Sequence, residues 1–446
     1  MTVFIIKAAQ LFLSLSILVV LHELGHFVPA KLFKTKVEKF YLFFDIKFSL
    51  FKKKIGETVY GIGWLPLGGY VKIAGMIDES MDKEQMAKPP QPWEFRSKPT
   101  WQRLIIMLGG VFMNFLLAFF LYMVILFVWG TIYIEKDDVK YGYGVSKTME
   151  NYGFQQGDKI VSVDGEPIES LSEDVGKYLM FRNIETIKVE HRNGVLEDLT
   201  IPEDIGKQLF AAGDLPAFEP RSPFQVEGIE PGLPAEKAGL MAKDKIVAVN
   251  GNPIVYFSDF TYQLKNSATK DIVLQVERNS ALQEFTITPT EDNKVGISVT
   301  RTDPDFIKVN QREYSLTESV SGGISKGYWE IKDYLAQFQY IFTKKGASQI
   351  GGFAAIGQMF PAQWNWQVFW KMTAFLSIML GVLNLLPIPA LDGGHVMFLL
   401  YEIISGRKPG DKFMEYAQLV GFVLLIGLVL FANGNDAFKA IQDWLN

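Results

Sequence analysis

The sequence contains no cysteine and only four histidines among its 446 residues. Without cysteine the chain cannot form disulfides or thiolate zinc sites, so histidine, aspartate and glutamate are the candidate metal ligands. The net charge is −5 and no basic stripe is present, which argues against nucleic acid as a partner. Charge is nearly absent from several long apolar runs and dense between them, as expected for membrane spans that flank soluble modules. A chain of this length predicts two or more domains.

Two of the four histidines belong to one short stretch, His22-Glu23-Leu24-Gly25-His26, at the end of the first apolar run. The stretch has the pattern H-E-x-x-H. On a helix its two histidines lie one turn apart on the same face, so both imidazoles can bind one metal ion. The glutamate between them can take a proton from metal-bound water. The alternative is two core histidines that share a helix face, and the scarcity of histidine in the chain disfavours it.

Four apolar runs predict transmembrane helices, since about 20 residues are needed to cross a membrane. We expect them within residues 1–30, 104–130, 368–395 and 414–433. A signal peptide is the alternative for the first run, but the H-E-x-x-H stretch stands where a cleavage site would be needed. Lysine and arginine gather after the first run, before the second, and between the third and fourth. By the positive-inside rule these segments face the cytoplasm.

The third run ends in a second stretch of site-like residues, Asn384-Leu-Leu-Pro-Ile-Pro-Ala-Leu-Asp392-Gly-Gly-His395. Its two prolines break the helix. Because the first and third runs both lead inward, this stretch and H-E-x-x-H reach a similar depth near the cytoplasmic face. Asp392 can therefore supply the third ligand of a catalytic zinc, which takes three protein ligands and leaves one position open. His395 is the competing third ligand, since imidazole suits zinc equally well.

A glycine-rich stretch, residues 61–73, lies within the expected cytoplasmic-side segment 31–103. It is apolar, but it is too short to span a membrane and too rich in glycine for a helix. Its β-formers predict a β-hairpin that dips into the membrane beside the site, where non-helical backbone is tolerated only next to protein or water. A surface hairpin is the alternative. In the second apolar run, Asn114 is polar and is either a helix-packing or a site residue.

Residues 141–302 have the pattern of soluble α/β modules with an internal repeat, in which residues 153–168 match residues 239–254. Each copy has a polar turn, a short strand and an Asp-Gly or Asn-Gly hairpin turn. Both resemble the central segment of PDZ domains, which bind extended peptides at a sheet edge. We expect two such domains, at 141–215 and 216–302, although only the second shows a clear preceding helix. An unrelated pair of β-rich domains is the alternative. An amphipathic helix and linker are expected at 310–365.

These motifs together resemble the site-2 protease family of intramembrane zinc metalloproteases, and among them the bacterial RseP-type members with tandem PDZ domains. The resemblance covers essentially the whole chain. It implies a polytopic α-helical membrane protein with four transmembrane helices, a membrane-dipping β-hairpin and two extracytoplasmic PDZ-like α/β domains. It also implies zinc (Zn2+) bound by His22, His26 and Asp392, with Glu23 as the general base.

The resemblance further implies that Asn384 positions the substrate backbone or its oxyanion, and that the glycine-rich stretch pairs with unwound substrate as an added strand. The candidate substrate-binding residues are Asn384, Gly68, Gly69, Tyr70, Val71 and Asn114. The sequence departs from the family pattern at Gly110 and Phe353, where proline is common. These departures affect the expected local geometry around the second apolar run and the linker, not the metal ligands.

The implied function is cleavage of transmembrane segments in single-span proteins of the bacterial inner membrane. Typical substrates of such enzymes are anti-sigma factors already cut outside the membrane, and remnant signal peptides. Membrane lipid would surround the spans, and the PDZ-like domains would lie in the periplasm. Two alternatives stay open. One is a membrane-tethered PDZ scaffold without catalysis, and the other is a metal-dependent transporter whose polar path would use Gln10, Asn114 and Gln418.

Overall fold

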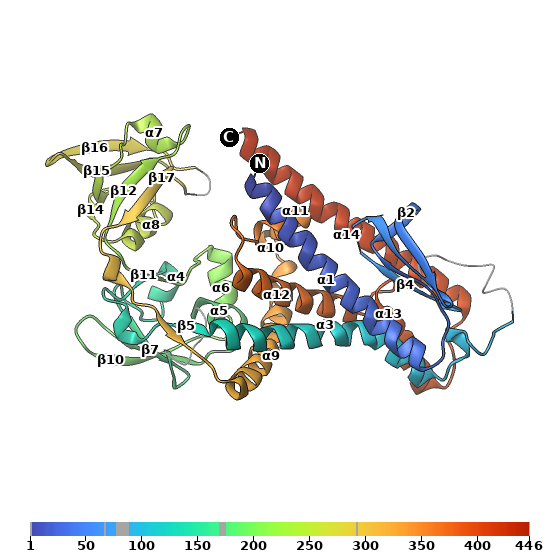
Figure 1. The fold of residues 1–446 in the computed structure, drawn as a ribbon. Helices are drawn as coiled ribbons and strands as arrows, with labels where there is room; N and C mark the ends of the chain where they lie inside the picture. Colours follow the sequence, from blue (N-terminus) through green and yellow to red (C-terminus); the bar gives the residue numbers. More distant parts are fainter. Residues whose placement is uncertain (1, 67, 77–88, 169–174, 291–292, 446) are drawn as a thin grey trace. The chain divides into compact units, whose positions relative to one another are not determined.

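The fold is known from a computed structural model, which describes residues 2–66, 68–76, 89–168, 175–290 and 293–445. The chain divides into two compact units, whose elements are drawn in Figure 1. The first, named the helical unit, comprises Met1–Gly130 and Glu313–Asn446. The second, named the module unit, comprises Thr131–Arg312.

Within the described residues, four helices of the helical unit are long and apolar enough to cross a membrane. They are α1 (Thr2–Leu32), α3 (Thr100–Trp129), α12 (Trp366–Leu385) and, inside α14 (Asp411–Leu445), the stretch Lys412–Gln442. Together with the strands, these helices fit a polytopic membrane protein. The third apolar run, expected as one element to residue 395, is interrupted by Pro387 and Pro389. A separate helix, α13 (Asp392–Ser405), begins after the interruption.

Glycine lets α1 and α3 cross with their backbones in contact. A Cβ atom on Gly25 would lie 2.6 Å from the carbonyl carbon of Gly109 and 2.8 Å from Cα of Gly110. Such separations are too short for real non-bonded carbon atoms, so a side chain does not fit at this crossing. The close approach brings the H-E-x-x-H stretch of α1 directly against α3, whose residues can then contact both histidines.

Two further helices pack on α3. The Ser377 hydroxyl of α12 donates a hydrogen bond to the backbone carbonyl of Asn114 (2.7 Å). The helix α9 (Leu316–Ile341) packs through Gly323 and Gly327, where added Cβ atoms would collide with side chains of α3. One face of α9, which lies within the segment 310–365, therefore packs on α3.

Two short helices, α10 (Lys344–Gln349) and α11 (Phe353–Gln358), connect α9 to α12. The Asp436 carboxylate of α14 accepts hydrogen bonds from the backbone N–H groups of Gly352 and Ala355, at 3.0 Å each. These bonds satisfy N–H groups that the first turn of a helix leaves free. They also fix the linker to the last membrane-spanning helix.

A four-stranded sheet in the helical unit differs from the predicted hairpin. Its strands are β1 (Val37–Leu42), β2 (Phe44–Ile55), β3 (Thr58–Leu65) and β4 (Tyr70–Ile73), in the order β2-β3-β1-β4. The glycine-rich stretch 61–73 supplies part of β3 and all of β4, yet these strands do not pair with each other. β1 lies between them, parallel to β3 and antiparallel to β4. The hairpin in this sheet is formed by β2 and β3 instead.

The module unit contains two successive copies of one topology. The first copy runs β6 (Tyr143–Val145), α4 (Lys147–Glu150), β7 (Lys159–Val163), β8 (Glu166–Pro167), α5 (Val175–Phe181), β9 (Thr186–Glu190), β10 (Leu196–Thr200), α6 (Ile205–Ala212) and β11 (Phe218–Pro220). The second runs β12 (Phe224–Ile229), α7 (Pro234–Ala238), β13 (Lys245–Val249), β14 (Asn252–Pro253), α8 (Phe257–Lys265), β15 (Ile272–Arg278), β16 (Ala281–Ile287) and β17 (Ile297–Arg301).

Strand pairing is the same in both copies. The first and last strands pair, β6 with β11 and β12 with β17, and the other four form sheets in the orders β10-β9-β7-β8 and β16-β15-β13-β14. A compact apolar core fills the second copy, with Val249, Ile272 and Leu274 fully buried. The repeat seen in the sequence is therefore a repeat of topology.

The structure changes two details of the expected organisation of this unit. Because β11 pairs with β6, the first copy extends beyond the expected boundary at residue 215. The short helix α4 stands in the first copy where α7 stands in the second, although the sequence showed no clear helix there. Outside both copies, β5 (Thr131–Tyr133) pairs with β18 (Asn310–Arg312) and joins the two ends of the unit.

Candidate metal centre

Three side chains from distant parts of the chain meet in the helical unit. Their facing atoms are Nε2 of His22, Nε2 of His26 and Oδ2 of Asp392. The two nitrogens are 3.2 Å apart, and the oxygen lies 3.3 Å and 3.4 Å from them. Both histidines are buried, and Asp392 is partly buried. Among the described residues, this is the one group of three or more such side chains close enough to hold a metal ion.

The histidines face one another because they lie four residues apart in α1, where that spacing places side chains on the same face. Helix α3 holds both rings from behind. His26 Nδ1 donates to the carbonyl oxygen of Ile106 (2.8 Å), and His22 Nδ1 lies 3.0 Å from Nδ2 of Asn114. Because Nδ1 of each ring is engaged, Nε2 is left for a metal ion, as is usual for metal-binding histidines.

Asn114, a candidate substrate-binding residue from the sequence, lies behind His22 instead. Its side chain is 0% exposed, so it is not open to a substrate. Its Oδ1 has no hydrogen-bond partner among the described residues. When His22 binds metal through Nε2, its Nδ1 carries a proton, and the amide of Asn114 can accept it after exchanging the positions of its oxygen and nitrogen. Asn114 is thus placed to orient the ring.

Gly110 leaves the space that the two imidazoles occupy. A Cβ atom on this residue would collide with Nε2 of His26 and would lie 2.7 Å from Cε1 of His22. The sequence presented Gly110 only as a departure from the family pattern. Its signal was the adjacent pair of glycines inside an apolar run, because small residues in a membrane span mark a close contact between helices.

The interruption after α12 carries Asp392 to the histidines. Asp392 is the first residue of α13, and Gly394 lets this first turn pack closely on the preceding segment. A Cβ atom on Gly394 would lie 2.6 Å from both the carbonyl oxygen of Ile388 and Cα of Pro389. The prolines end α12, and the glycines allow α13 to begin a few residues later. The carboxylate of Asp392 is thereby directed toward the histidines.

Glu23 follows His22 on α1 and faces the edge strand β4. The backbone N–H of Val71 donates a hydrogen bond to its carboxylate. A Cβ atom on Gly69 would lie 3.4 Å from Cγ of Glu23 and 2.6 Å from Cγ1 of Val19. The chain can therefore approach α1 this closely only with glycine at residue 69. Gly69 and Val71 are the two members of the predicted substrate-binding stretch that lie against Glu23.

Gly68 and Tyr70 contact the sheet instead. The Tyr70 hydroxyl donates to Oδ1 of Asp45 (2.7 Å), and its ring stacks on that of Tyr41 with centroids 5.4 Å apart. A Cβ atom on Gly68 would lie 3.3 Å from the ring of Phe44. Successive residues of an extended chain point to opposite sides, so only alternate members of the stretch are directed toward α1.

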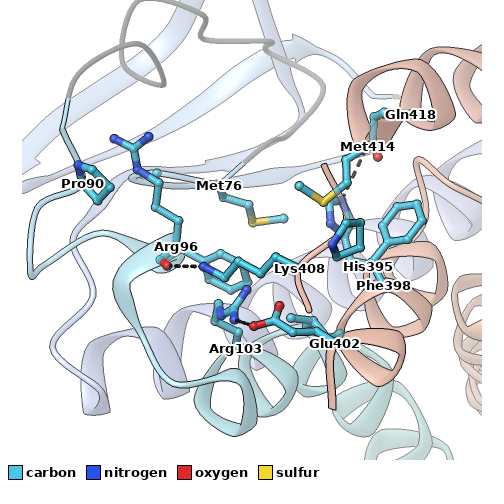
Figure 2. A pocket seen from close by; sticks show the side chains of 14 residues that line it. Met76, Pro90, Arg96, Arg103, His395, Phe398, Glu402, Lys408, Met414 and Gln418 are labelled. Carbon is cyan, nitrogen blue, oxygen red and sulfur yellow. Dashed lines mark hydrogen bonds and ion pairs between the residues drawn. The ribbon is translucent and has the colours of Figure 1, made fainter. Parts of the chain in front are cut away.

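Asn384 lies in the last turn of α12 with its Nδ2 atom 3.4 Å from Nε2 of His22, so it approaches the cluster. His395, the competing third ligand, does not. It lies one turn along α13 from Asp392, with its Nε2 atom 3.4 Å from Nε2 of Gln418, and it lines a separate cavity (Figure 2). Of the two candidates for the third position, Asp392 is the one that the structure brings to the histidines.

The polar residues that a transporter path would use bond to three different segments. Gln10 donates to the backbone carbonyl of Pro361 (2.9 Å), Asn114 contacts His22, and Gln418 contacts His395. Each contact joins a membrane-spanning helix to another part of the helical unit. This arrangement favours a packing role for the three side chains over a common polar path.

The three facing atoms fit a zinc ion. Bonds of about 2.0–2.1 Å at tetrahedral angles place ligand atoms about 3.3–3.4 Å apart, and the observed separations are 3.2, 3.3 and 3.4 Å. Oδ2 of Asp392 is buried and accepts no hydrogen bond from the described residues, although buried polar atoms are normally paired. Three protein ligands leave a fourth position open, which is the arrangement of catalytic zinc.

Comparison with known proteins gives a consistent result across the chain. The sequence profile of Peptidase family M50 matches residues 10–428. The regulator of sigma-E protease RseP of Escherichia coli is 27% identical, over 97% of this chain and 98% of its own. The regulator of sigma E protease of Haemophilus influenzae is 26% identical, over 98% and 99%. A candidate zinc metalloprotease of Neisseria meningitidis is 28% identical, over 96% and 98%. The similarity includes both units.

Proposed function

Because the chain belongs to peptidase family M50 and is a zinc metalloprotease of the site-2 type, we propose that it cleaves transmembrane segments of single-span proteins. The observation that carries the proposal is the convergence of His22, His26 and Asp392 within a unit of membrane-spanning helices. A catalytic group placed among such helices has membrane-embedded peptide bonds within reach. The four apolar helices and the similarity to RseP indicate an inner-membrane protein.

In the proposed mechanism, His22, His26 and Asp392 would hold zinc, which would supply Lewis-acid chemistry and lower the pKa of the water bound to it. Glu23, hydrogen-bonded by the N–H of Val71, accepts a proton from the attacking water at its carboxylate. It then delivers the proton to the leaving amine. Asn384 donates from its amide to the carbonyl oxygen of the substrate, where negative charge develops. Asn114 keeps the ring of His22 in the orientation that the reaction needs.

We propose that the substrate binds as an extended segment beside β4. The peptide groups of a helix are hydrogen-bonded to one another. The substrate helix must therefore unwind to expose a peptide bond before that bond can be hydrolysed. β4 is the last strand of its sheet, and the chain from Gly69 to Val71 lies against Glu23. A segment that adds to this edge would bring a peptide bond to the cluster, because strand addition aligns the two backbones.

Two substrate classes agree with this site. The relatives named as regulators of sigma E support anti-sigma-factor-like proteins as substrates, after a first cut outside the membrane. Remnant signal peptides are the second class, since they are also single apolar segments without a large outer domain. In both classes the substrate is a short membrane segment that has lost a bulky part.

We further propose that the module unit lies in the periplasm and excludes substrates that still carry a bulky outer domain. The repeated topology, with its hairpin turns after β7 and β13, supports PDZ-like modules. Among the described residues of this unit there is no group that could hold a metal ion. Its histidine, His191, is engaged by two carboxylates. The unit therefore suits selection rather than chemistry.

Deletion of residues 131–312 tests this role, and the structure makes the deletion practicable. Thr131 and Arg312 pair directly between β5 and β18, so the deletion joins positions that are already adjacent. The intact protein should cut only an outer-trimmed substrate, and the shortened protein should cut both the trimmed and the full-length form. A shortened protein that keeps its zinc yet cuts neither form would show that the unit presents substrate instead.

The main proposal is tested with purified protein and candidate single-span substrates in detergent or liposomes. We expect cleavage within the transmembrane segment, loss of cleavage on addition of a chelator, and recovery when zinc is restored. Mass spectrometry of the products locates the cut. A membrane-tethered scaffold would bind these proteins without producing fragments under any of the three conditions, and that result would overturn the proposed function.

A further inference from the structure

A cavity of about 270 Å³ lies in the helical unit, and none of the metal-centre residues lines it (Figure 2). Its lining comes from the segments before and within the short helix Phe95–Ser97, from the start of α3, from α13 and from the start of α14. These chain segments are rich in lysine and arginine, so the positive-inside rule places them at the cytoplasmic face. The cavity is therefore expected at the level of lipid headgroups.

The walls of the cavity are mostly apolar, with side chains from the segment before α3, from α13 and from α14. Met76, Phe95, Phe398 and Met414 contribute to them. Among the described lining residues the charged ones are Arg96, Arg103, Glu402 and Lys408, which Figure 2 labels. A site with apolar walls and a small number of fixed polar groups is typical of one that binds an amphiphilic molecule.

Arg103 is the buried charged group of this site. Its side chain is 8% exposed and pairs with Glu402, with Nη2 at 2.6 Å from Oε1. Nε donates to the backbone carbonyl of Lys98 (3.0 Å), and Nη2 also donates to the hydroxyl of Thr100 (3.2 Å). No hydrogen bond joins Nη1 to any described residue. The Nη1 edge of Arg103 can therefore donate to a further anion.

Lys408 supplies a second set of donors. Its side chain crosses the cavity in Figure 2, and its ammonium donates to the backbone carbonyl of Arg96 at 3.1 Å. No other partner is found among the described residues, so two of its three N–H groups can bind a ligand. Arg103 and Lys408 thus both offer cationic N–H donors, and such donors bind a phosphodiester through charge-assisted hydrogen bonds.

We propose that this cavity binds the headgroup of an anionic phospholipid from the cytoplasmic leaflet. Arg103 and Lys408 hold the phosphodiester oxygens, and the apolar walls contact the glycerol backbone. The volume is near the lower limit for small-molecule sites, so it admits a headgroup and not the acyl chains. These chains continue along exposed apolar side chains of α13 and α14, which include Ile403, Ile404 and Phe413. A zwitterionic lipid is disfavoured because its ammonium group would lie beside the cationic groups of Arg103 and Lys408.

The test uses the full-length, zinc-loaded protein and two matched variants. Lys408→Gln removes one proposed ligand, and Lys412→Gln removes an exposed lysine four residues further on that does not line the cavity. Native mass spectrometry measures the dissociation constant of short-chain phosphatidylglycerol, with phosphatidylcholine as the zwitterionic probe. Loss of a charge-assisted hydrogen bond predicts about 10-fold weaker phosphatidylglycerol binding for Lys408→Gln. Lys412→Gln should bind it as the unmodified protein does, and both variants should retain their zinc.

A third variant, Met414→Trp, tests the cavity without changing its charge. The larger side chain should fill the space and weaken phosphatidylglycerol binding at least as much as Lys408→Gln does. Equal weakening by the two lysine variants, or equal binding of the two lipids, would show general surface attraction and overturn the proposal. Inorganic phosphate at the same concentration should not displace the lipid. If it does, the site serves a soluble phosphate, and the lipid assignment fails.

Discussion

The helical unit and the module unit each contain buried histidine beside carboxylate groups, but the ring nitrogens face different atoms in the two units. In the module unit, His191 Nδ1 lies 2.8 Å from Oδ1 of Asp158, and its Nε2 lies 2.9 Å from Oε2 of Glu197. Each ring nitrogen has an oxygen partner, so the ring is held as an imidazolium that donates twice. In the helical unit, His22 and His26 instead turn one nitrogen of each ring toward the other, at 3.2 Å.

This difference separates a structural ion pair from a metal centre. Two ring nitrogens cannot both donate to each other, and Oδ2 of Asp392 beside them accepts no hydrogen bond from the described residues. The three atoms therefore leave a position for a cation. In His191, by contrast, both ring nitrogens already have a carboxylate oxygen as a hydrogen-bond partner. Both clusters combine buried histidine with carboxylates, so residue type does not distinguish them and the direction of the ring nitrogens does.

The second copy of the module topology supports a structural role for His191. Asp244 precedes β13 as Asp158 precedes β7, and it pairs with Arg278 through two bonds of 2.7 Å and 2.6 Å. Lys245 of β13 pairs with Glu277 and Lys159 of β7 pairs with Glu190, so Arg278 and His191 each come one residue after an equivalent pair. Because arginine is not a zinc ligand and does not titrate in this range, the shared function of the two pairs is to hold the fold.

The largest contrast between the two clusters should come from removing a metal ligand. Asp392→Ala should abolish cleavage. It should also reduce zinc affinity by more than the roughly 10- to 100-fold that is lost when a residue hydrogen-bonded to a metal ligand is removed. His395→Ala and His191→Gln should both retain zinc, because neither ring faces the other ligands. Zinc content after dialysis against graded chelator concentrations measures the difference. If only His395→Ala loses metal, the third ligand is His395 and not Asp392.

The second effect separates catalysis from metal binding within the helical unit. Glu23→Gln should reduce cleavage by about 10²- to 10⁴-fold, the usual contribution of general acid–base catalysis, while the zinc content stays unchanged. The amide oxygen of glutamine can still accept from the N–H of Val71, so the local fold is preserved. Zinc content and cleavage must be measured on one preparation. Full activity of the variant would disprove the mechanism, and loss of zinc would make Glu23 a ligand.

A smaller effect is expected when a residue that orients a ligand is changed. Asn114→Ala should weaken zinc binding by about 10- to 100-fold, because His22 loses the partner of its Nδ1 atom. Asn114→Asp keeps an acceptor at this position and should restore most of the affinity. Ser377→Ala is the control, since it removes only the hydrogen bond to the Asn114 backbone. Similar losses in the alanine and aspartate variants would point to helix packing as the role of Asn114.

Side-chain chemistry made part of this arrangement predictable from sequence. Hydropathy predicted the four membrane-spanning helices, and the inward direction of two of them predicted that Asp392 would approach H-E-x-x-H. What the sequence did not reveal depends on backbone approach. Gly110 makes room for the imidazoles, and the N–H of Val71 bonds to Glu23. The separation of β3 from β4 depends on a strand that precedes both in the chain, so no local pattern indicates it.

The smallest predicted effect concerns the pH dependence of the module unit. Hydrogen bonds from the protonated ring of His191 to Asp158 and then to Glu197 raise the pKa of His191 above its ordinary value of 6.5. A raised pKa means that protonation favours the folded state. The stabilisation is fully present below the pKa of the unfolded chain and is lost as the pH rises through the higher folded value. Each unit by which the pKa is raised corresponds to about 1.4 kcal/mol.

Two measurements on the full-length protein check this prediction. With four histidines in the chain, a ring-proton NMR titration resolves His191 by the signal that His191→Arg removes, and its pKa should exceed 6.5. Proteolysis in increasing urea at pH 6 and pH 9 should show the first copy losing stability at the higher pH. His191→Arg, which imitates Arg278, should remove this loss, and the second copy should not change in either protein. A pKa at or below 6.5 would mean that the two carboxylates do not hold the ring as an imidazolium, and the structural distinction between the two histidine clusters would lose its physical basis.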